Sequence, residues 1–414
     1  MNGEAEQSKT RPARIALMFS DTGGGHRSAT EAIEAAIRQV VAEEGADREV
    51  ELTVDNIVEK THVINRAFVQ FYNYLLRHHQ SAMKYYYWFI ETFKPNDSEL
   101  GWQITRDYLN AQVASIAPDV LVSVHPMTNQ YLAKSLRETG LLGKTKLVTV
   151  VTDPNGDFWS GWACPQADLS IVPNDLAKGR LIELGVDPGK IAVMGMPIHP
   201  DFRNPPSMSP EQFRHHLGLS RELPTICINA GWAGGGNMMA VYKALESVKR
   251  QVQVIFLCGH NQKLYEKLKR AARLSPIPTA VLPFHDSMSD VMASCDLMVT
   301  KAGGLTSYEA IARRLPMAID MITVPMPQEL GTARILCKQE LAFALEKPED
   351  ILGIVEKLKL RSDGEPAPLP EAHQLNLVDA SFNIARKLLT MAGLKLNASV
   401  RQTDNTAKAN STQQ

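Results

Sequence analysis

The sequence has no long apolar run, little cysteine and no excess of either charge. Nowhere do about 18 apolar residues follow one another, which excludes a helix that spans a bilayer. The 5 cysteines lie far apart, without the spacing of a metal site or a redox pair, so we expect reduced and mostly buried thiols. With 44 basic and 45 acidic residues, the net charge of −1 gives no overall attraction to nucleic acid, and no such partner is expected.

The beginning of the chain lacks the apolar core of a signal peptide. Residues 1–14 are polar and charged, so we expect a protein of the cytoplasm. Residues 1–12 and 395–414 are rich in small polar residues and lysine and poor in large apolar ones. Such composition cannot offset the entropy lost on folding, and both segments are predicted to be disordered tails.

Between the tails, the sequence is typical of two α/β domains. A chain of 414 residues with 44% hydrophobic content can bury more than one core. Short β-branched runs alternate with helical stretches, which is the pattern of a parallel, doubly wound sheet. The predicted strands are 14–20, 50–55, 120–124, 147–151, 169–172 and 191–194 in the first half, and 225–229, 252–257, 279–282, 297–299 and 317–319 in the second.

A proline-rich stretch separates the two series of strands. It contains Pro197, Pro200, Pro205, Pro206 and Pro210 among polar residues. We therefore place a linker at 198–222, between an N-terminal domain of 13–197 and a second domain of 223–372. The amphipathic stretch 373–394 is predicted to be a helix that packs back on another element. The predicted fold class is α/β, with two Rossmann-like domains that face each other across a cleft.

A glycine-rich loop joins the first predicted strand to the first helix. Gly24 and Gly25 would let the backbone approach a ligand and free the amides at the helix start, and His26 follows them. An imidazole there can titrate near pH 7 and take a proton from a hydroxyl group. The alternative is that the glycines only make a tight turn and that His26 is a polar residue at a helix end. The loop also departs from the G-x-G-x-x-G pattern, and no phosphate-binding lysine follows it.

Four loops of the second half are candidates for a nucleotide-sugar site. Glycine loops at helix starts suit a diphosphate, backbone groups after a strand suit a base edge, a carboxylate one turn inside a helix suits a ribose, and an amide beside a carboxylate suits sugar hydroxyls. The residues that would provide these contacts are Gly231, Gly234, Gly235, Phe284, His285, Lys301, Gly303, Gly304, Thr306, Glu309, Gln328 and Glu329. Taken singly, each loop is better explained by a plain turn than by a site. Their order along the chain favours a site.

Several segments resemble the monogalactosyldiacylglycerol synthase family. They read SDTGGGHRSATEAI, PDVLVSVHPMTNQ, VTVVTDP, IVPNDLAKGRLIELGVDPGKIAVMGMPIHPDF and TKAGGLTSYEAIARRLP, and the resemblance covers roughly residues 13–360. That family shares its fold with bacterial diacylglycerol glucosyltransferases and, more distantly, with the peptidoglycan-precursor N-acetylglucosaminyltransferase. The resemblance implies a GT-B fold, an acceptor-binding first domain, a UDP-sugar-binding second domain, and inversion at the sugar without an essential metal or other cofactor.

The resemblance also implies roles for individual residues. His26 matches the family's proposed general base or acceptor-site residue, Asp153 the aspartate of its TD motif, and His125 the histidine of its SVHP motif. Glu309 matches the ribose-binding glutamate, while Gln328 and Glu329 match the sugar-binding pair. The chain departs from the family pattern at Ala302 (often Pro), Trp159 (often His), Pro327 (often Gly) and Thr332 (often Asn). The last three leave the sugar and the acceptor details open.

An aromatic segment, residues 73–93, is the candidate membrane contact. Tyr86, Trp88 and Phe89 lie in it among other aromatic residues, with arginine, lysine and histidine around them. Aromatic rings beside cationic groups suit the headgroup region of an anionic membrane. The alternative is a buried amphipathic helix of the first domain.

Together these patterns predict an inverting hexosyltransferase at the inner face of the cell membrane. It would move galactose or, as a second choice, glucose from a UDP-sugar to diacylglycerol, with His26 as base and Asp153 orienting it. Asp153 and Asp157 do not form a D-x-D metal motif, and no metal is expected. The alternatives are a same-fold enzyme with another acceptor, such as N-acetylglucosaminyl transfer to a lipid-linked precursor, a UDP-sugar epimerase, and a non-catalytic nucleotide-sugar-binding protein.

Overall fold

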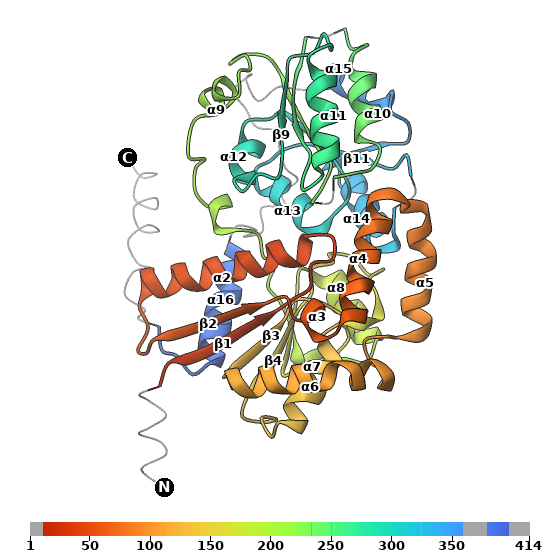
Figure 1. Cartoon of the computed structure of the whole chain (residues 1–414). Coiled ribbons are helices and arrows are strands. Elements are labelled where there is room, and N and C mark those ends of the chain that lie inside the picture. Colours follow the sequence, from red (N-terminus) through yellow and green to blue (C-terminus); the bar gives the residue numbers. More distant parts are fainter. Residues whose placement is uncertain (1–10, 233, 250, 324, 359–378, 397–414) are drawn as a thin grey trace, which may run out of the picture.

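The computed structural model of the chain describes residues 11–232, 234–249, 251–323, 325–358 and 379–396, apart from the side chains of Gln80 and Pro327. Two α/β domains lie one above the other, with the N-terminal domain below in Figure 1. Most of the predicted tails, residues 1–10 and 397–414, and residues 359–378 lie outside the described part.

The first domain is built on a parallel sheet with the strand order β2-β1-β3-β4-β5-β6. The strands are β1 (Ala13–Met18), β2 (Val50–Asp55), β3 (Val120–Ser123), β4 (Lys146–Val150), β5 (Leu169–Val172) and β6 (Ile191–Val193). Leu17 of β1 lies opposite Val54 and Val122, so apolar side chains line up across the sheet. Because helices cover both faces of the sheet, the central strands β1 and β3 are almost wholly buried, whereas the edge strands β2 and β6 are partly exposed.

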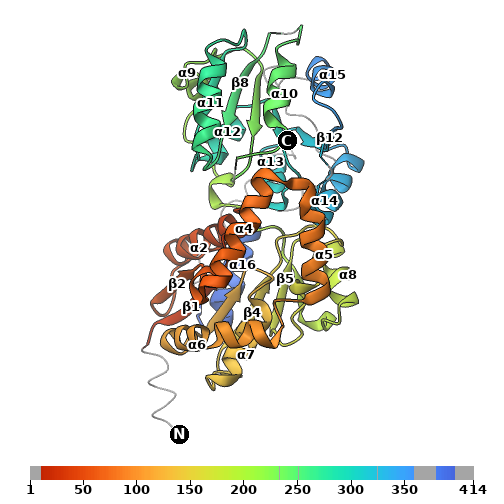
Figure 2. The same ribbon diagram turned by 45° about the vertical axis from the view of Figure 1, so that its right-hand side comes forward.

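Helices cover both faces of this sheet. They are α2 (Gly25–Glu44), α3 (Ile57–Thr61), α4 (Val63–His78), α5 (Met83–Phe93), α6 (Glu99–Ile116), α7 (Asn129–Glu138) and α8 (Asp175–Glu183), with short 3₁₀ turns at Gln80–Ala82, Ser160–Trp162, Pro188–Lys190 and Pro200–Phe202. Figure 2 shows α4 and α5 reaching from the first domain toward α13 and α14 of the second. The predicted aromatic segment is therefore divided between two helices, with a break at His79.

The second domain repeats the design with the strand order β12-β11-β10-β7-β8-β9. Its strands are β7 (Thr225–Asn229), β8 (Gln253–Leu257), β9 (Thr279–Leu282), β10 (Leu297–Thr300), β11 (Met317–Asp320) and β12 (Ala342–Leu345). Its helices are α10 (Met238–Leu245), α11 (Gln262–Ala272), α12 (Met288–Ala293), α13 (Gly304–Ala312), α14 (Pro327–Lys338) and α15 (Asp350–Lys357). The predicted linker contains a further helix, α9 (Pro210–His216), which starts with a capping box between Ser209 and Gln212.

The last described helix, α16 (Ala380–Met391), returns to the first domain. Its Phe382, Leu388 and Leu389 belong to one buried cluster with Ile33 and Ile37 of α2. Residues 373–378 of the predicted final helix lie outside the described residues. Because the chain crosses from one domain to the other and back, the two domains are tied together at two places.

The predicted fold class is confirmed: two parallel sheets, each with helices on its faces, form two nucleotide-type domains. All the predicted strands are present to within a few residues. Strand β12 was not predicted. Its four residues AFAL include two exposed ones and contain no β-branched residue, so neither composition nor alternation distinguishes them from a turn.

Candidate active site

The carboxyl ends of the two sheets face each other across a cleft between the domains. The cleft has a volume of about 650 Å³, which is the size of a small-molecule site. The predicted residues that line it are Gly24, Gly25, His26 and Asp153 from the first domain, and Gly231, Phe284, His285, Lys301, Gly303, Gly304, Thr306, Glu309, Gln328 and Glu329 from the second. Residues far apart in the sequence therefore meet in one place.

The glycine run before α2 has a conformational reason. Gly23 and Gly24 have φ values of 73° and 87°, in the left-handed region that favours glycine. A Cβ on Gly24 would also lie 2.6 Å from the side chain of Trp232 in the second domain. The run therefore turns the chain into α2 and lets the second domain approach the start of that helix.

His26 lies in the first turn of α2, with its ring against those of His125 and Trp162, whose centroids are 4.4 and 5.8 Å away. Its Nδ1 is 3.3 Å from the hydroxyl of Thr152. Burial lowers the pKa of His26 to about 4, although a hydrogen bond with the Val124 backbone opposes the shift. The expectation that His26 titrates near pH 7 is therefore wrong, and the ring is neutral at that pH. A neutral imidazole can accept a proton.

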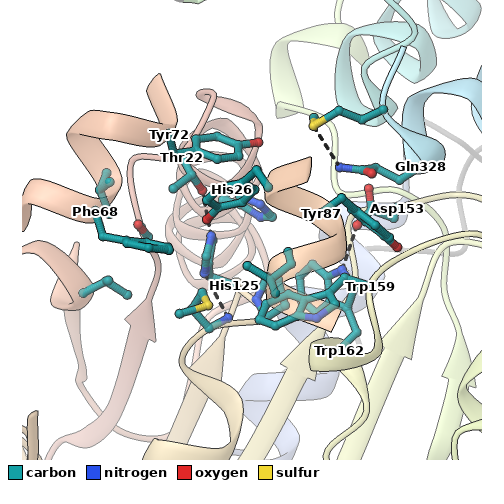
Figure 3. A pocket seen from close by; sticks show the side chains of 18 of the residues that line it. Thr22, His26, Phe68, Tyr72, Tyr87, His125, Asp153, Trp159, Trp162 and Gln328 are labelled. Carbon is teal, nitrogen blue, oxygen red and sulfur yellow. Dashed lines mark hydrogen bonds between the residues drawn. The ribbon is translucent and has the colours of Figure 1, made fainter. Parts of the chain in front are cut away.

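His125 is held in one tautomer. The N–H of Met127 donates to Nδ1 at 3.1 Å, so Nδ1 is an acceptor, and Nε2 carries the proton that faces the Thr22 hydroxyl at 2.7 Å. Burial lowers the pKa of His125 well below its ordinary value, and the neighbouring His26 lowers it further. Because its Nδ1 lone pair accepts the Met127 N–H and its Nε2 faces Thr22, His125 supports the loop around His26 (Figure 3).

Asp153 follows β4 and faces the same space. Its Oδ2 accepts the indole N–H of Trp162 at 2.7 Å. Burial raises the pKa of Asp153 to about 6, the hydrogen bond from Trp162 opposes the shift, and the charge of Glu329 adds to it. Among the described residues, Thr152 and not Asp153 is within hydrogen-bond distance of the His26 ring. We therefore correct the predicted orienting role of Asp153.

A second cavity, of about 110 Å³, opens beside the cleft between α4 and α5 (Figure 3). Its apolar and aromatic lining consists of Val58, Phe68, Val69, Tyr72, Tyr86, Tyr87, Ile90, Pro126, Met127, Trp159, Trp162 and Met326. The residues that line both this cavity and the cleft are Thr22, His26, Tyr72, Asp153, Met326 and Gln328. His26 and Asp153 therefore stand where an apolar cavity meets the cleft between the domains.

Glu309 is the buried carboxylate of the second domain. It lies on α13, is 8% exposed and lines the cleft. Burial raises its pKa to about 7. No side-chain hydrogen bond or ion pair to Glu309 is present among the described residues, so its oxygens are free to accept hydrogen bonds from a ligand. A carboxylate so placed suits the two hydroxyls of a ribose.

Phe284 and His285 lie on the wall of the cleft after β9. The ring of Phe284 stacks on His260, with centroids 4.4 Å apart, and His260 lies edge-on to Trp232 at 5.1 Å. The Nδ1 of His285 accepts the N–H of Ser287 at 3.1 Å, which leaves Nε2 as the nitrogen available to a ligand. A planar base can stack or pair against such a wall.

Gln328 and Glu329 lie in the first turn of α14 and line the cleft, and Gln328 also lines the apolar cavity together with His26. The amide oxygen Oε1 of Gln328 is buried without a hydrogen-bond partner. Burial raises the pKa of Glu329, while the charge of Lys301 and a hydrogen bond with the Met326 backbone lower it. Leaving a buried acceptor unpaired is unfavourable by about 1–3 kcal/mol. A ligand hydroxyl would relieve that cost, so this corner fits a polyhydroxylated group.

Gly234 and Gly235 do not line the cleft, and we correct their predicted donor contact. A Cβ on Gly234 would lie 2.2 Å from the carbonyl oxygen of Cys258. One on Gly235 would lie 3.3 Å from the carbonyl oxygen of Arg77, at the end of α4. Both glycines are needed for close packing, the first inside the second domain and the second between the domains.

The departures from the family pattern have structural explanations in part. Ala302 is 1% exposed and packs in the core of the second domain. Trp159 lines the apolar cavity, and its indole N–H has no partner among the described residues. The hydroxyl of Thr332 accepts from Asn155 of the first domain at 2.8 Å, so Thr332 contacts the other domain rather than the cleft. The side chain of Pro327 is outside the description.

The predicted membrane residues divide into two groups. Tyr86 packs against Tyr72 and Phe68 and lines the apolar cavity, so its side chain is partly buried. Trp88 and Phe89, on the same helix α5, are 63% and 38% exposed. Further exposed apolar side chains on α4 and α5 are Val63, Ile64, Phe71, Tyr74, Tyr85 and Phe93. The two helices therefore share an exposed apolar face on one side and the cavity on the other.

Some lining residues were not predicted from the sequence. Thr22 and Thr152 are neighbours of residues that the motifs identified, and their position beside those motifs was an available signal. Trp232 and Met326 belong to the predicted loops that contain Gly231 and Gln328. Tyr72 lies in no motif, and only the fold brings it to the site. Within the described ranges, no group of three or more histidine, cysteine or acidic residues could hold a metal ion. Metal independence stays a prediction. The described helices include none that is long and apolar enough to cross a membrane.

Two family models match the chain, one in each domain. The model described as "Monogalactosyldiacylglycerol (MGDG) synthase" matches residues 26–198. The model described as "Glycosyltransferase family 28 C-terminal domain" matches residues 237–341. The first match begins at His26 and includes Asp153, and the second includes Glu309, Gln328 and Glu329.

Among curated proteins, the chain is similar to monogalactosyldiacylglycerol synthase of Spinacia oleracea, at 30% identity over 84% of this chain and 66% of the relative. It is similar to monogalactosyldiacylglycerol synthase 1 of Arabidopsis thaliana, at 29% identity over 83% and 64% of the two chains. A probable monogalactosyldiacylglycerol synthase of Nicotiana tabacum is 28% identical, over 91% of this chain and 70% of the relative. The chain thus spans about two thirds of the length of these relatives.

Solved structures with a similar fold include MurG of Acinetobacter baumannii, with a TM-score of 0.54 at 12% identity, covering 92% of this chain and 100% of that one. A putative UDP-N-acetylglucosamine 2-epimerase of Listeria monocytogenes has a TM-score of 0.55 at 13% identity. The match covers 92% of this chain and 95% of that one. At such low identity the likeness concerns the fold alone.

The predicted location is corrected by these relatives. We predicted the cytoplasm and the inner face of the cell membrane, but the curated relatives are named as chloroplastic proteins. The prediction rested on residues 1–14 having no apolar core. That feature argues against a secretory signal but does not distinguish one compartment within a cell from another.

Proposed function

We propose that this chain is a glycosyltransferase that moves a hexose from a UDP-sugar to diacylglycerol at a membrane surface. Its two domains match the models of the monogalactosyldiacylglycerol synthase family and of the C-terminal domain of glycosyltransferase family 28, which supports the proposal. Galactose is the favoured sugar because the curated relatives are named for galactosyl transfer. The observation that carries the proposal is the shared wall of His26 and Asp153 between the apolar cavity and the cleft.

The donor is proposed to occupy the cleft on the side of the second domain. Glu309 would accept hydrogen bonds from the ribose, and Lys301 and His285 would face the diphosphate. The unpaired oxygen of Gln328 and the carboxylate of Glu329 would accept hydrogen bonds from hydroxyls of the hexose. This order places the anomeric carbon next to the wall that contains His26.

The acceptor is proposed to enter from the cavity between α4 and α5. The exposed face of these helices, with Trp88 and Phe89, would rest in the headgroup region of a membrane, where aromatic rings are stable. Lys84 lies above the ring of Tyr85 at 4.9 Å, which adds a positive charge beside that face. The acyl chains could then stay in the bilayer while the glycerol hydroxyl reaches His26.

The chemical step is a direct displacement. The oxygen of the glycerol hydroxyl bonds to the anomeric carbon, the bond from that carbon to UDP breaks, and UDP leaves with the electron pair. The neutral imidazole of His26 accepts the hydroxyl proton, which is worth about 10²–10⁴ in rate for a well-placed base. Lys301 and the amides at the starts of the second-domain helices oppose the charge that develops on the diphosphate.

Incubation with radiolabelled UDP-galactose or UDP-glucose and vesicles that contain diacylglycerol tests the proposal. It predicts a labelled glycolipid that depends on diacylglycerol, with one sugar preferred. Label released only as free hexose, or recovered as an epimerised UDP-sugar, would contradict it. Label transferred to another lipid-linked acceptor but not to diacylglycerol would contradict the acceptor alone.

A further inference from the structure

Asn155, in the loop after β4, joins the two domains through its side chain. Its Nδ2 donates to the backbone carbonyl of Gln328 at 2.6 Å and to the hydroxyl of Thr332 at 2.8 Å. Its Oδ1 accepts the N–H of Asp157 at 2.8 Å. Asn155 and Thr332 are 1% and 3% exposed. Every hydrogen-bonding atom of the amide group is thus used, in a place without access to water.

Thr332 completes the junction from the second domain. Its hydroxyl donates to the Gln328 carbonyl at 2.9 Å while it accepts from Asn155. A Cβ on Gly331 would lie 2.9 Å from Oδ1 of Asn155, so the helix and the loop are in close contact. The first turn of α14 is therefore fixed against the loop that carries Asp153.

We propose that Asn155 and Thr332 are positioning residues for the donor sugar. The inference rests on the proposed function, in which Gln328 and Glu329 bind the hexose. Both belong to the turn of α14 that the junction holds, and Asn155 is two residues after Asp153. The junction therefore sets the sugar-binding pair at a defined distance from the wall where the acceptor hydroxyl reacts.

The nucleotide part of the donor should not depend on this junction. Glu309 lies on α13, and Lys301 lies in the loop before this helix. Helix α13 has its own contact with the first domain. There, Asn174 donates to the hydroxyl of Tyr308 at 3.2 Å and to the carbonyl of Pro154 at 2.7 Å. The domains remain joined at α13 when the α14 junction is broken. We therefore expect recognition of the sugar, but not of the nucleotide, to depend on the α14 junction.

Thr332→Val and Thr332→Ser test this by calorimetry with UDP and with the preferred UDP-hexose. Valine keeps the shape and deletes the hydroxyl, and serine keeps the hydroxyl. Because a buried donor and acceptor lose their partner, valine should weaken UDP-hexose binding roughly tenfold and UDP binding by less than about twofold. Serine should stay close to the wild type. An equal loss for both ligands, or equal behaviour of valine and serine, would overturn the inference.

Asn155→Asp is the second variant. It removes both donated hydrogen bonds to the second domain and sets a carboxylate oxygen against the Gln328 carbonyl, while it keeps an acceptor for the Asp157 N–H. It should show the same selective loss of UDP-hexose affinity, whereas Tyr308→Phe, which removes a bond at α13, should not. Loss of the fold in both Asn155→Asp and Thr332→Val would overturn the positioning role.

The binding readout distinguishes this inference from the proposed function. If the wild type binds UDP-hexose more tightly than UDP but transfers nothing to diacylglycerol, the proposed acceptor fails and the positioning role can still be measured. If the wild type gains no affinity from the hexose, the positioning role is overturned whatever the acceptor is.

Discussion

Gly24 of the first domain lies against Trp232 of the second, so closely that a Cβ on Gly24 would be 2.6 Å from the Trp232 side chain. The two residues belong to the loops that follow the first strand of each sheet. This contact sets how near the start of α2, and with it His26, comes to the second domain.

Gly24→Ala should therefore reduce transfer by roughly tenfold or more, because the new methyl group forces Trp232 away and strains a backbone with φ of 87°. Gly25→Ala is the matched control, since a Cβ there meets nothing within 4 Å. Turnover with saturating donor is the measurement. Equal turnover in the two variants would show that the close approach of the domains has no part in the reaction.

Glu309→Gln should weaken UDP binding by about 1–3 kcal/mol, since hydrogen bonds to a charged acceptor are lost. The pKa of Glu309 is raised to about 7 by burial, so its carboxylate is charged above that pH and neutral below it. Wild-type affinity for UDP should therefore fall as the pH decreases through about 7, and the variant should lose this dependence. Calorimetry between pH 6 and 8 would check both, and an unchanged affinity in the variant would remove Glu309 from the site.

Trp88→Ser combined with Phe89→Ser should reduce sedimentation with anionic vesicles without changing UDP affinity or the melting temperature. Both side chains are exposed, so their loss removes no core contact. Tyr86→Ser is the contrasting variant: it should leave vesicle binding intact and lower transfer, because Tyr86 lines the cavity. If the double variant sediments like the wild type, the exposed face of α5 does not bind the membrane.

Activity should survive chelation by EDTA. Lys301 and the helix-start amides are proposed to stabilise the leaving diphosphate, and such groups work without an added ion. The measurement is transfer with and without EDTA, followed by addition of Mg²⁺ or Mn²⁺. A complete loss that either ion restores would contradict the proposed stabilisation.

Much of the fold could be predicted because each strand is a short apolar run next to a helix, and that signal is local. The glycine loops were found for the same reason. The contacts that complete the site are not local. Asn155 and Thr332 are 177 positions apart, and no pattern in the sequence around either residue predicts the contact with the other. Gly234 belongs to a glycine-rich loop that predicts a ligand contact, but in the structure this glycine allows close packing against Cys258.

The electrostatics of the site also could not be predicted from residue types. An imidazole is expected to titrate near pH 7, yet burial lowers the pKa of His26 to about 4 and raises that of Asp153 to about 6. Both shifts come from side chains that surround these groups in the folded chain. The pH at which the reaction slows should therefore differ according to whether His26 or Asp153 is the base.

The most direct test of the account is the pH profile of transfer by the wild type and by His26→Ala. If His26 is the base, the variant should lose about 10²-fold or more in turnover with little change in UDP affinity or melting temperature. The wild type should keep its turnover as the pH falls through 6 and lose it only near pH 4, where the imidazole becomes protonated. A variant with near-normal turnover, or a wild type whose turnover at saturating donor falls with a midpoint near pH 6, would contradict the assignment and point to Asp153 as the base.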